Sequence, residues 1–187
     1  MLTATLGAAM LSGCAAVVVG GAATGAAVAN DRRTTGSVIE DQAIELKARK
    51  AISDAKDVDS QTHINVTSYN QIVLLSGEAN SEELRRQAVD LVSGVEKIRH
   101  VHNEIQIAAP SSFMARSNDT VLTTKVKTKL FATKNLDATR VKVVTEAGNV
   151  YLMGLLSQEE AQRAAEAASQ VSGVLKVIKL FEYTDSN

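Results

Sequence analysis

The amino-acid sequence contains the same succession of segments twice, about 78 residues apart. In residues 41–107, a charged helical segment is followed by two Ile/Val-rich runs, an Ala/Leu/Val-rich helical segment and a last apolar run. Residues 119–183 repeat this order, with one short gap between the first helical segment and the first strand and two additional residues near the second helical segment. Solenoid repeats are roughly 20–50 residues long, so a period of this length indicates a duplicated small domain.

Each copy is predicted to fold as a helix, a strand hairpin, a second helix and a last strand. Turn residues at 68–71 and 146–149 separate apolar runs, which is the pattern of a hairpin. The predicted fold class is therefore α+β: two tandem αββαβ domains, each with a three-stranded sheet packed against two helices. Leu75 and Leu152 are expected at equivalent core positions.

The ends of the copies are also visible in the sequence. Gly94 and Gly173 each stand in a Val-Ser-Gly-Val sequence, and we expect both to end the second helix in the left-handed conformation. Residues 108–118, which contain the single proline Pro110, are predicted to be the linker between the domains. Each copy has only about 65 residues, near the lower limit for an independent core. We therefore expect the copies to pack on each other.

The N-terminal residues are typical of an exported protein. An apolar run ends in small residues just before Cys14, the only cysteine, as at a signal-peptide cleavage site. The sequence at residues 11–14, Leu-Ser-Gly-Cys, resembles a bacterial lipobox, in which cleavage leaves the cysteine as a lipidated first residue. One departure from the pattern of a signal peptide is that no Lys or Arg precedes the apolar run. The alternative to lipidation is that Cys14 is a buried free cysteine. We predict a signal peptide at 1–13, lipidation of Cys14, and a flexible tether at 14–40 with a reach of roughly 25–30 Å.

Composition excludes several classes of function. The formal net charge is −1, which argues against nucleic acid as a partner. Aromatic residues make up 3% of the chain and tryptophan is absent, so base-stacking surfaces and aromatic ligand cages are not expected. His100 and His102 could begin a metal site, but no further ligands occur at a recognisable spacing. The sequence therefore predicts no catalytic residues, no metal site and no cofactor, and we expect a non-enzymatic protein.

The two first helical segments differ in charge. Residues 41–60 contain five acidic and four basic side chains, whereas residues 119–140 have a net charge of about +3. On a helical wheel, Lys125 and Lys129 border the apolar stripe of the second segment, while Val121, Lys127 and Phe131 point away from it.

Cations beside exposed apolar groups are typical of a helix that lies on an anionic lipid surface. A solvated helix face with no partner is the alternative. The predicted lipid-binding residues are Val121, Leu122, Lys125, Lys127, Lys129 and Phe131.

Several short sequences resemble those of BON domains. They are the glycine after the second strand of each copy, the repeated Val-Ser-Gly-Val, and Asn118-Asp119-Thr120 followed by Thr-Thr-Lys-Val at 123–126. With the lipobox in front, the chain resembles dual-BON outer-membrane lipoproteins of Gram-negative bacteria. The residue after the cysteine is Ala15 and not the aspartate that usually retains bacterial lipoproteins at the inner membrane. By resemblance, this implies sorting to the outer membrane. One departure is Val121, where such proteins often carry tryptophan.

The resemblance implies a lipid-anchored protein on the periplasmic face of the outer membrane. It implies binding to anionic phospholipid and support of envelope integrity, without catalysis. Two alternatives remain open. One is a scaffold for an envelope assembly, such as the outer-membrane protein insertion or cell-division machinery. The other is an osmotic-stress periplasmic protein with no fixed lipid partner.

Overall fold

The computed structural model describes residues 31–184. Domain 1 consists of two helices at its start, a hairpin, a third helix and a last strand; their bounds are α2 (Thr35–Asp54), α3 (Lys56–Asp59), β1 (Thr62–Tyr69), β2 (Ile72–Ala79), α4 (Glu82–Ser93) and β3 (His100–Ile107). The predicted signal peptide, Cys14 and residues 14–30 of the predicted tether lie outside the described residues, so their assignments remain predictions.

Domain 2 has the same order, with a 3-10 turn in place of the short second helix. Its elements are α5 (Phe113–Phe131), η1 (Ala138–Arg140), β4 (Lys142–Glu146), β5 (Asn149–Leu156), α6 (Gln158–Ser169) and β6 (Lys176–Tyr183). The predicted αββαβ order is therefore confirmed in both copies.

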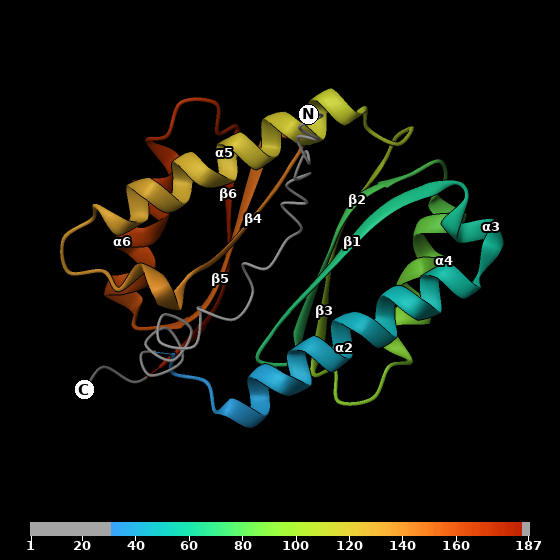
Figure 1. The fold of residues 1–187 in the computed structure, drawn as a ribbon, viewed down its shortest axis with the longest axis horizontal. Helices are drawn as coiled ribbons and strands as arrows, with labels where there is room; N and C mark the ends of the chain where they lie inside the picture. The colour runs from blue at the N-terminus through green and yellow to red at the C-terminus, as the bar shows by residue number, and fades with distance from the viewer. Residues whose placement is uncertain (1–30, 185–187) are drawn as a thin grey trace, which may run out of the picture. The chain divides into compact units, whose positions relative to one another are not determined.

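Each domain contains one three-stranded sheet with the hairpin's second strand at its centre. β2 pairs antiparallel with β1 and parallel with β3, and β5 does the same with β4 and β6. Figure 1 shows α2 and α4 on one face of the first sheet, and α5 and α6 on one face of the second. Leu75 and Leu152 are fully buried beneath these helices, at the equivalent core positions that the sequence predicts.

Helices α2 and α5 begin earlier than predicted. The sequence places their starts at Asp41 and Asp119, but a side-chain cap precedes each by several residues: the Thr34 hydroxyl accepts a hydrogen bond from the Ser37 amide, and the Ser112 hydroxyl accepts one from the Ala115 amide. Such caps satisfy backbone donors that have no partner inside the helix. The linker between β3 and α5 is therefore shorter than residues 108–118.

Neither Gly94 nor Gly173 ends a helix in the left-handed conformation, so the expectation is wrong for both. Gly94 directly follows α4 but has φ −77°. Gly173 has a left-handed φ of +102°, but it lies three residues beyond Gln170, the C-cap of α6.

The strand registers explain the difference in φ between the two glycines. Ile72 and Asn149 are the first residues of β2 and β5, and they pair with His100 and Lys176, respectively. Lys97 and Gly173 each lie three residues before these partners, so they are structural counterparts, and Lys97 also has a positive φ of 69°. The two Val-Ser-Gly-Val sequences are therefore not at equivalent positions.

The free faces of the two sheets pack on each other, as the small size of each copy predicts. An apolar cluster lies between them, formed by Tyr69, Leu74, Tyr151 and Met153. Because β2 and β5 are buried on both faces, alternate residues contribute either to the domain core or to this cluster. Ion pairs surround it; they include Lys142–Glu45 at 3.0 Å, Arg99–Glu182 at 2.8 Å and Arg32–Glu160 at 2.6 Å.

A buried carboxylate also lies between the domains. Glu146 is 4% exposed and accepts hydrogen bonds from the Asn65 amide at 2.9 Å and the Ser76 hydroxyl at 3.3 Å. Burial raises the pKa of Glu146, the Asn65 hydrogen bond opposes that shift, and the nearby Glu78 carboxylate adds to it. His63 on β1 and Asp119 on α5 are the other charged or titratable groups that act on it.

Replacing Glu146 by glutamine is expected to stabilise the protein at neutral pH. A carboxyl group whose pKa is raised by folding binds its proton more tightly when folded, so its contribution to stability falls as the pH rises through the folded pKa. Thermal melts of Glu146→Gln and wild type should therefore differ at pH 7 and converge in acid, where both side chains are neutral. A glutamine variant that melts below wild type at pH 7 would contradict this account.

Candidate functional site

Helix α5 is held against domain 2 by one apolar face. Leu122, Val126 and Leu130 recur at helical spacing and are at most 7% exposed in the core. They pack with Val143 and Leu152 of the sheet beneath. The opposite face of α5 is consequently turned outward along the whole helix.

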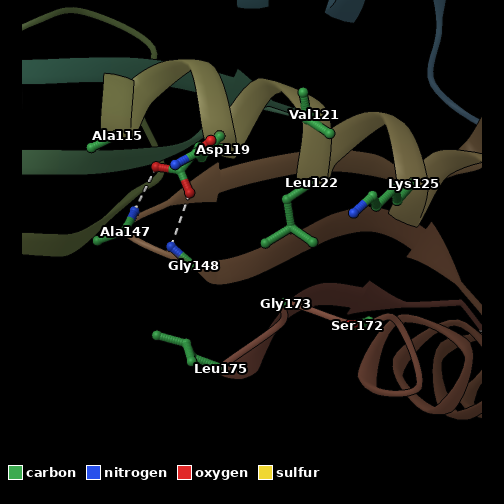
Figure 2. Close-up of a pocket in the computed structure, with 11 residues that line it drawn as sticks. Ala115, Asp119, Val121, Leu122, Lys125, Ala147, Gly148, Ser172, Gly173 and Leu175 are labelled. Atoms are coloured by element: carbon green, nitrogen blue, oxygen red, sulfur yellow. Dashed lines mark hydrogen bonds between the residues drawn. The ribbon is translucent and has the colours of Figure 1, made fainter. Parts of the chain in front are cut away.

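The carboxylate of Asp119 fixes the first half of α5 to the hairpin turn. It accepts hydrogen bonds from the backbone amides of Ala147 and Gly148, both at 2.9 Å (Figure 2). Asp41 makes the equivalent contacts in domain 1, with the amides of Asn70 and Gln71 at 2.7 Å. Asp119 therefore points inward, and it is the only acidic residue between Phe113 and Phe131.

The outward face of α5 combines large apolar side chains with lysines. Val121 is 52% exposed and Phe131 is 66% exposed. Lys125, Lys127 and Lys129 are all exposed and form no ion pair within residues 31–184. The structure therefore brings five of the six predicted site residues to the surface of one helix.

Leu122 is the exception among the predicted residues. It belongs to the inward stripe of α5 and is only 7% exposed, so it supports the helix from the core side. Its position next to Val121 in sequence turns it about 100° around the helix, away from the outward face.

An open cavity borders α5 at its contact with the segment between α6 and β6. Its volume is about 440 Å³. Val121 and Lys125 line it on the helix side, and Gly148, Gly173 and Leu175 line it on the other side (Figure 2). We call it the α5 cavity. The Leu175 amide donates to the Gly148 carbonyl at 3.0 Å, which fixes this segment to the hairpin turn.

Domain 1 closes the corresponding place with charged side chains. The counterpart of Asn118 is Glu40, and the counterpart of Gly173 is Lys97; in domain 1 these two form an ion pair. The counterpart of Ser172 is Glu96, whose carboxylate lies 3.7 Å from Lys47, the counterpart of Lys125. Domain 2 has neither carboxylate, so its cavity is open and Lys125 has no acidic partner among the described residues.

Sequence reasoning missed several residues of this surface. Leu175 is 78% exposed, and Phe113 and Met114 are 80% and 70% exposed at the start of α5. Phe113 and Met114 fell in the predicted linker, although the Ser112 cap is a recognisable helix start. Leu175 was not recognised as a residue of this surface, because aligning the copies on the repeated Val-Ser-Gly-Val put this segment out of register.

The described residues contain no group of three or more His, Cys, Asp or Glu side chains that could hold a metal ion. His100 and His102 lie with ring centroids 4.4 Å apart. Within residues 31–184, none of the helices is both long and apolar enough to cross a membrane.

Comparison with known proteins agrees with this duplicated architecture. The model of the BON domain matches residues 40–109 and again residues 118–185. The chain belongs to the BON-domain family. It is 42% identical over 175 residues to the outer membrane lipoprotein DolP of Haemophilus influenzae, covering 94% of this chain and 91% of that protein.

Two further relatives are less similar to this chain. One is a 21 kDa hemolysin of Actinobacillus pleuropneumoniae, 37% identical, with 82% of this chain and 79% of the relative covered. The other is the osmotically-inducible protein Y of Escherichia coli, 32% identical, with 82% and 77% covered. The DolP-like, dual BON-domain organisation expected from the sequence is therefore shown.

Proposed function

We propose that this protein is a non-enzymatic outer-membrane lipoprotein whose second BON domain binds anionic phospholipid through α5. The proposed anchor is an acyl chain on Cys14, which incorporation of labelled fatty acid would reveal. The proposed orientation places the domains at the periplasmic face of the outer membrane. The similarity to an outer membrane lipoprotein over 94% of the chain supports the location.

The observation that carries the proposal is the difference in ion pairing between the duplicated helices. On α2, each basic side chain has an acidic partner: Lys47 with Glu96, Arg49 with Glu45, and Lys50 with Asp54. On α5, none of the three lysines has one within the described residues. Since the two helices are copies of one another, the absence of acidic partners distinguishes domain 2 from domain 1.

Unpaired lysines beside exposed apolar groups fit the chemistry of an anionic membrane surface. Lys125, Lys127 and Lys129 would approach phosphate groups while Val121 and Phe131 enter the headgroup region. Each lysine near such a surface contributes about 1 kcal/mol, so three contribute roughly 3 kcal/mol. That corresponds to weak binding in solution, but an acyl anchor makes the contact intramolecular and therefore effective.

Vesicle binding tests the proposal directly. The fragment of residues 31–187, which forms one compact unit, is expected to sediment with vesicles that contain phosphatidylglycerol and to remain free with phosphatidylcholine alone. Binding should weaken as salt rises, because the screening length falls from about 30 Å at 0.01 M to about 8 Å at 0.15 M. Equal binding to both vesicle types would contradict the proposal.

A protein-binding role for domain 1 is the second candidate. Ile39 and Leu46 are 62% and 70% exposed on α2, two helical turns apart. An apolar pair at this spacing is typical of a contact with another protein chain, such as a component of an envelope assembly. Binding through this face should persist at high salt, which separates it from the electrostatic contact of α5.

A further inference from the structure

A second depression lies beside α5, where its C-terminal half contacts α6. Its volume is about 280 Å³, and its lining residues are Lys129, Ala132, Thr133, Arg163, Glu166, Ala167 and Gln170. We call it the α5–α6 groove. Two of its side chains are cationic, and one of these, Arg163, comes from α6 and not from the helix predicted to bind lipid.

The cations of the groove are poorly neutralised. Lys129 has no ion pair in the described part of the chain. Arg163 lies 3.5 Å from Glu159, but that carboxylate is 81% exposed, and such a surface pair contributes little. Glu166 also lines the groove and keeps its negative charge, while its carboxylate accepts a hydrogen bond from the Gln162 amide at 2.6 Å. With two cations and one carboxylate, the groove lining has a net charge of +1.

One donor of Arg163 has no partner. Its Nε atom is buried and makes no hydrogen bond within the structure described. Buried donors are rarely left unsatisfied in folded proteins, so such an atom calls for a physical explanation. The buried Nε atom itself is closed to the open groove, so an anion that enters the groove would bind the other donors of this guanidinium group.

Domain 1 has no cation at either position. The counterpart of Lys129 is Ala51, as counted from the matched Asp41 and Asp119. The counterpart of Arg163 is Gln87, as counted from the serines that cap α4 and α6. The basic groove is therefore specific to domain 2, like the unpaired lysines of α5.

The groove and the α5 cavity lie along the same edge of α5. Lys125 lines the cavity and Lys129 lines the groove. Residues four apart in a helix lie one above the other on one face. A membrane surface that rests on the outward face of α5 would therefore reach both depressions at once.

We propose that the α5–α6 groove binds the phosphate group of an anionic phospholipid, with Arg163 as its specific ligand and Lys129 as a second cation. The planar guanidinium group matches phosphate oxygens through two parallel hydrogen bonds, whereas lysine provides a single point charge. This inference rests on the proposed function and adds a residue of α6 to it. It assigns one lipid phosphate to a defined position beside the more diffuse contact of α5.

The test compares Arg163→Gln, which installs the domain 1 residue, with Arg86→Gln on α4 as the matched control. Arg86 is a 64% exposed side chain paired with Glu83, so its loss removes the same charge far from the groove. Affinity for phosphatidylglycerol vesicles is expected to fall about tenfold for Arg163→Gln, the usual effect of losing one charge-assisted contact. Arg86→Gln should bind like wild type, and Arg163→Lys should recover only part of the loss.

Three results would overturn the inference in distinguishable ways. If Arg163→Gln binds these vesicles like wild type, while wild type still prefers them to phosphatidylcholine, the groove is excluded and the proposed function stands. If wild type shows no preference for anionic vesicles, both fail. If inorganic phosphate shifts the nuclear magnetic resonance signals of Arg163 while anionic vesicles leave them unchanged, the ligand is free phosphate and not a lipid.

Discussion

Replacing Lys125 and Lys129 together by glutamate is expected to abolish binding to anionic vesicles. Each reversal removes an attraction of about 1 kcal/mol and adds a repulsion of similar size, so the pair changes the binding free energy by about 4 kcal/mol. That is roughly a thousandfold in affinity. Both side chains are exposed, so the melting temperature should remain close to that of wild type. Vesicle sedimentation and a thermal melt on the same sample measure the two quantities.

The duplicated domain supplies the control for this charge reversal. Lys47 and Lys50 lie on α2 at similar exposure and already have acidic partners, Glu96 and Asp54. Their replacement by glutamate changes the net charge of the protein by the same amount. We expect this variant to retain most of its binding. An equal loss in both variants would show that the vesicles respond to net charge and not to α5.

Replacing Gly77 by alanine is expected to have the largest effect on stability. Gly77 has φ +117°, and a Cβ atom there would lie 1.9 Å from the carbonyl oxygen of His63. The neighbouring atom is backbone on the adjacent strand, so the clash can be relieved only by moving β1 or β2. Backbone strain of this kind, together with the displaced strand, should cost about 3 kcal/mol or more.

Gly94→Ala is the matched control for this substitution. Gly94 has φ −77°, and the nearest atom to its added Cβ would be 3.5 Å away, an ordinary contact. Its free energy of unfolding should be unchanged or slightly raised, because alanine restricts the unfolded chain. Urea unfolding of the fragment of residues 31–187 measures both variants. A Gly77→Ala midpoint equal to that of wild type would show that the β1–β2 register is wrong.

The sequence was sufficient for features that depend on local pattern. The apolar stripe that Lys125 and Lys129 border in the sequence is the inward face of α5, although Leu122 of that stripe was also predicted to bind lipid. The charge difference between the copies pointed to the outward face. Gly77 and Gly154, which the sequence placed after the second strand of each copy, lie inside the central strands β2 and β5. A Cβ atom at these positions would meet neighbouring backbone at 1.9 Å and 2.6 Å, respectively. A glycine at that point is therefore required by the fold, and its recurrence in both copies was informative.

Features that depend on chain packing were not accessible in the same way. The α5 cavity exists because Gly173 and Ser172 replace Lys97 and Glu96, and this match appears only when strand registers align the copies. The repeated Val-Ser-Gly-Val suggested a different alignment, three residues out of register. Arg163 lines the α5–α6 groove because α6 packs beside α5. No residue spacing in the sequence specifies that packing.

The central claim, that α5 of domain 2 is the membrane-contacting element, is tested most directly by nuclear magnetic resonance. Isotope-labelled protein of residues 31–187 would be titrated with nanodiscs of phosphatidylglycerol and, separately, of phosphatidylcholine. We predict chemical-shift changes and line broadening in α5 and at residues 172–175 with the anionic nanodiscs alone. Changes that map to α2, or that spread evenly over both domains, would contradict the account.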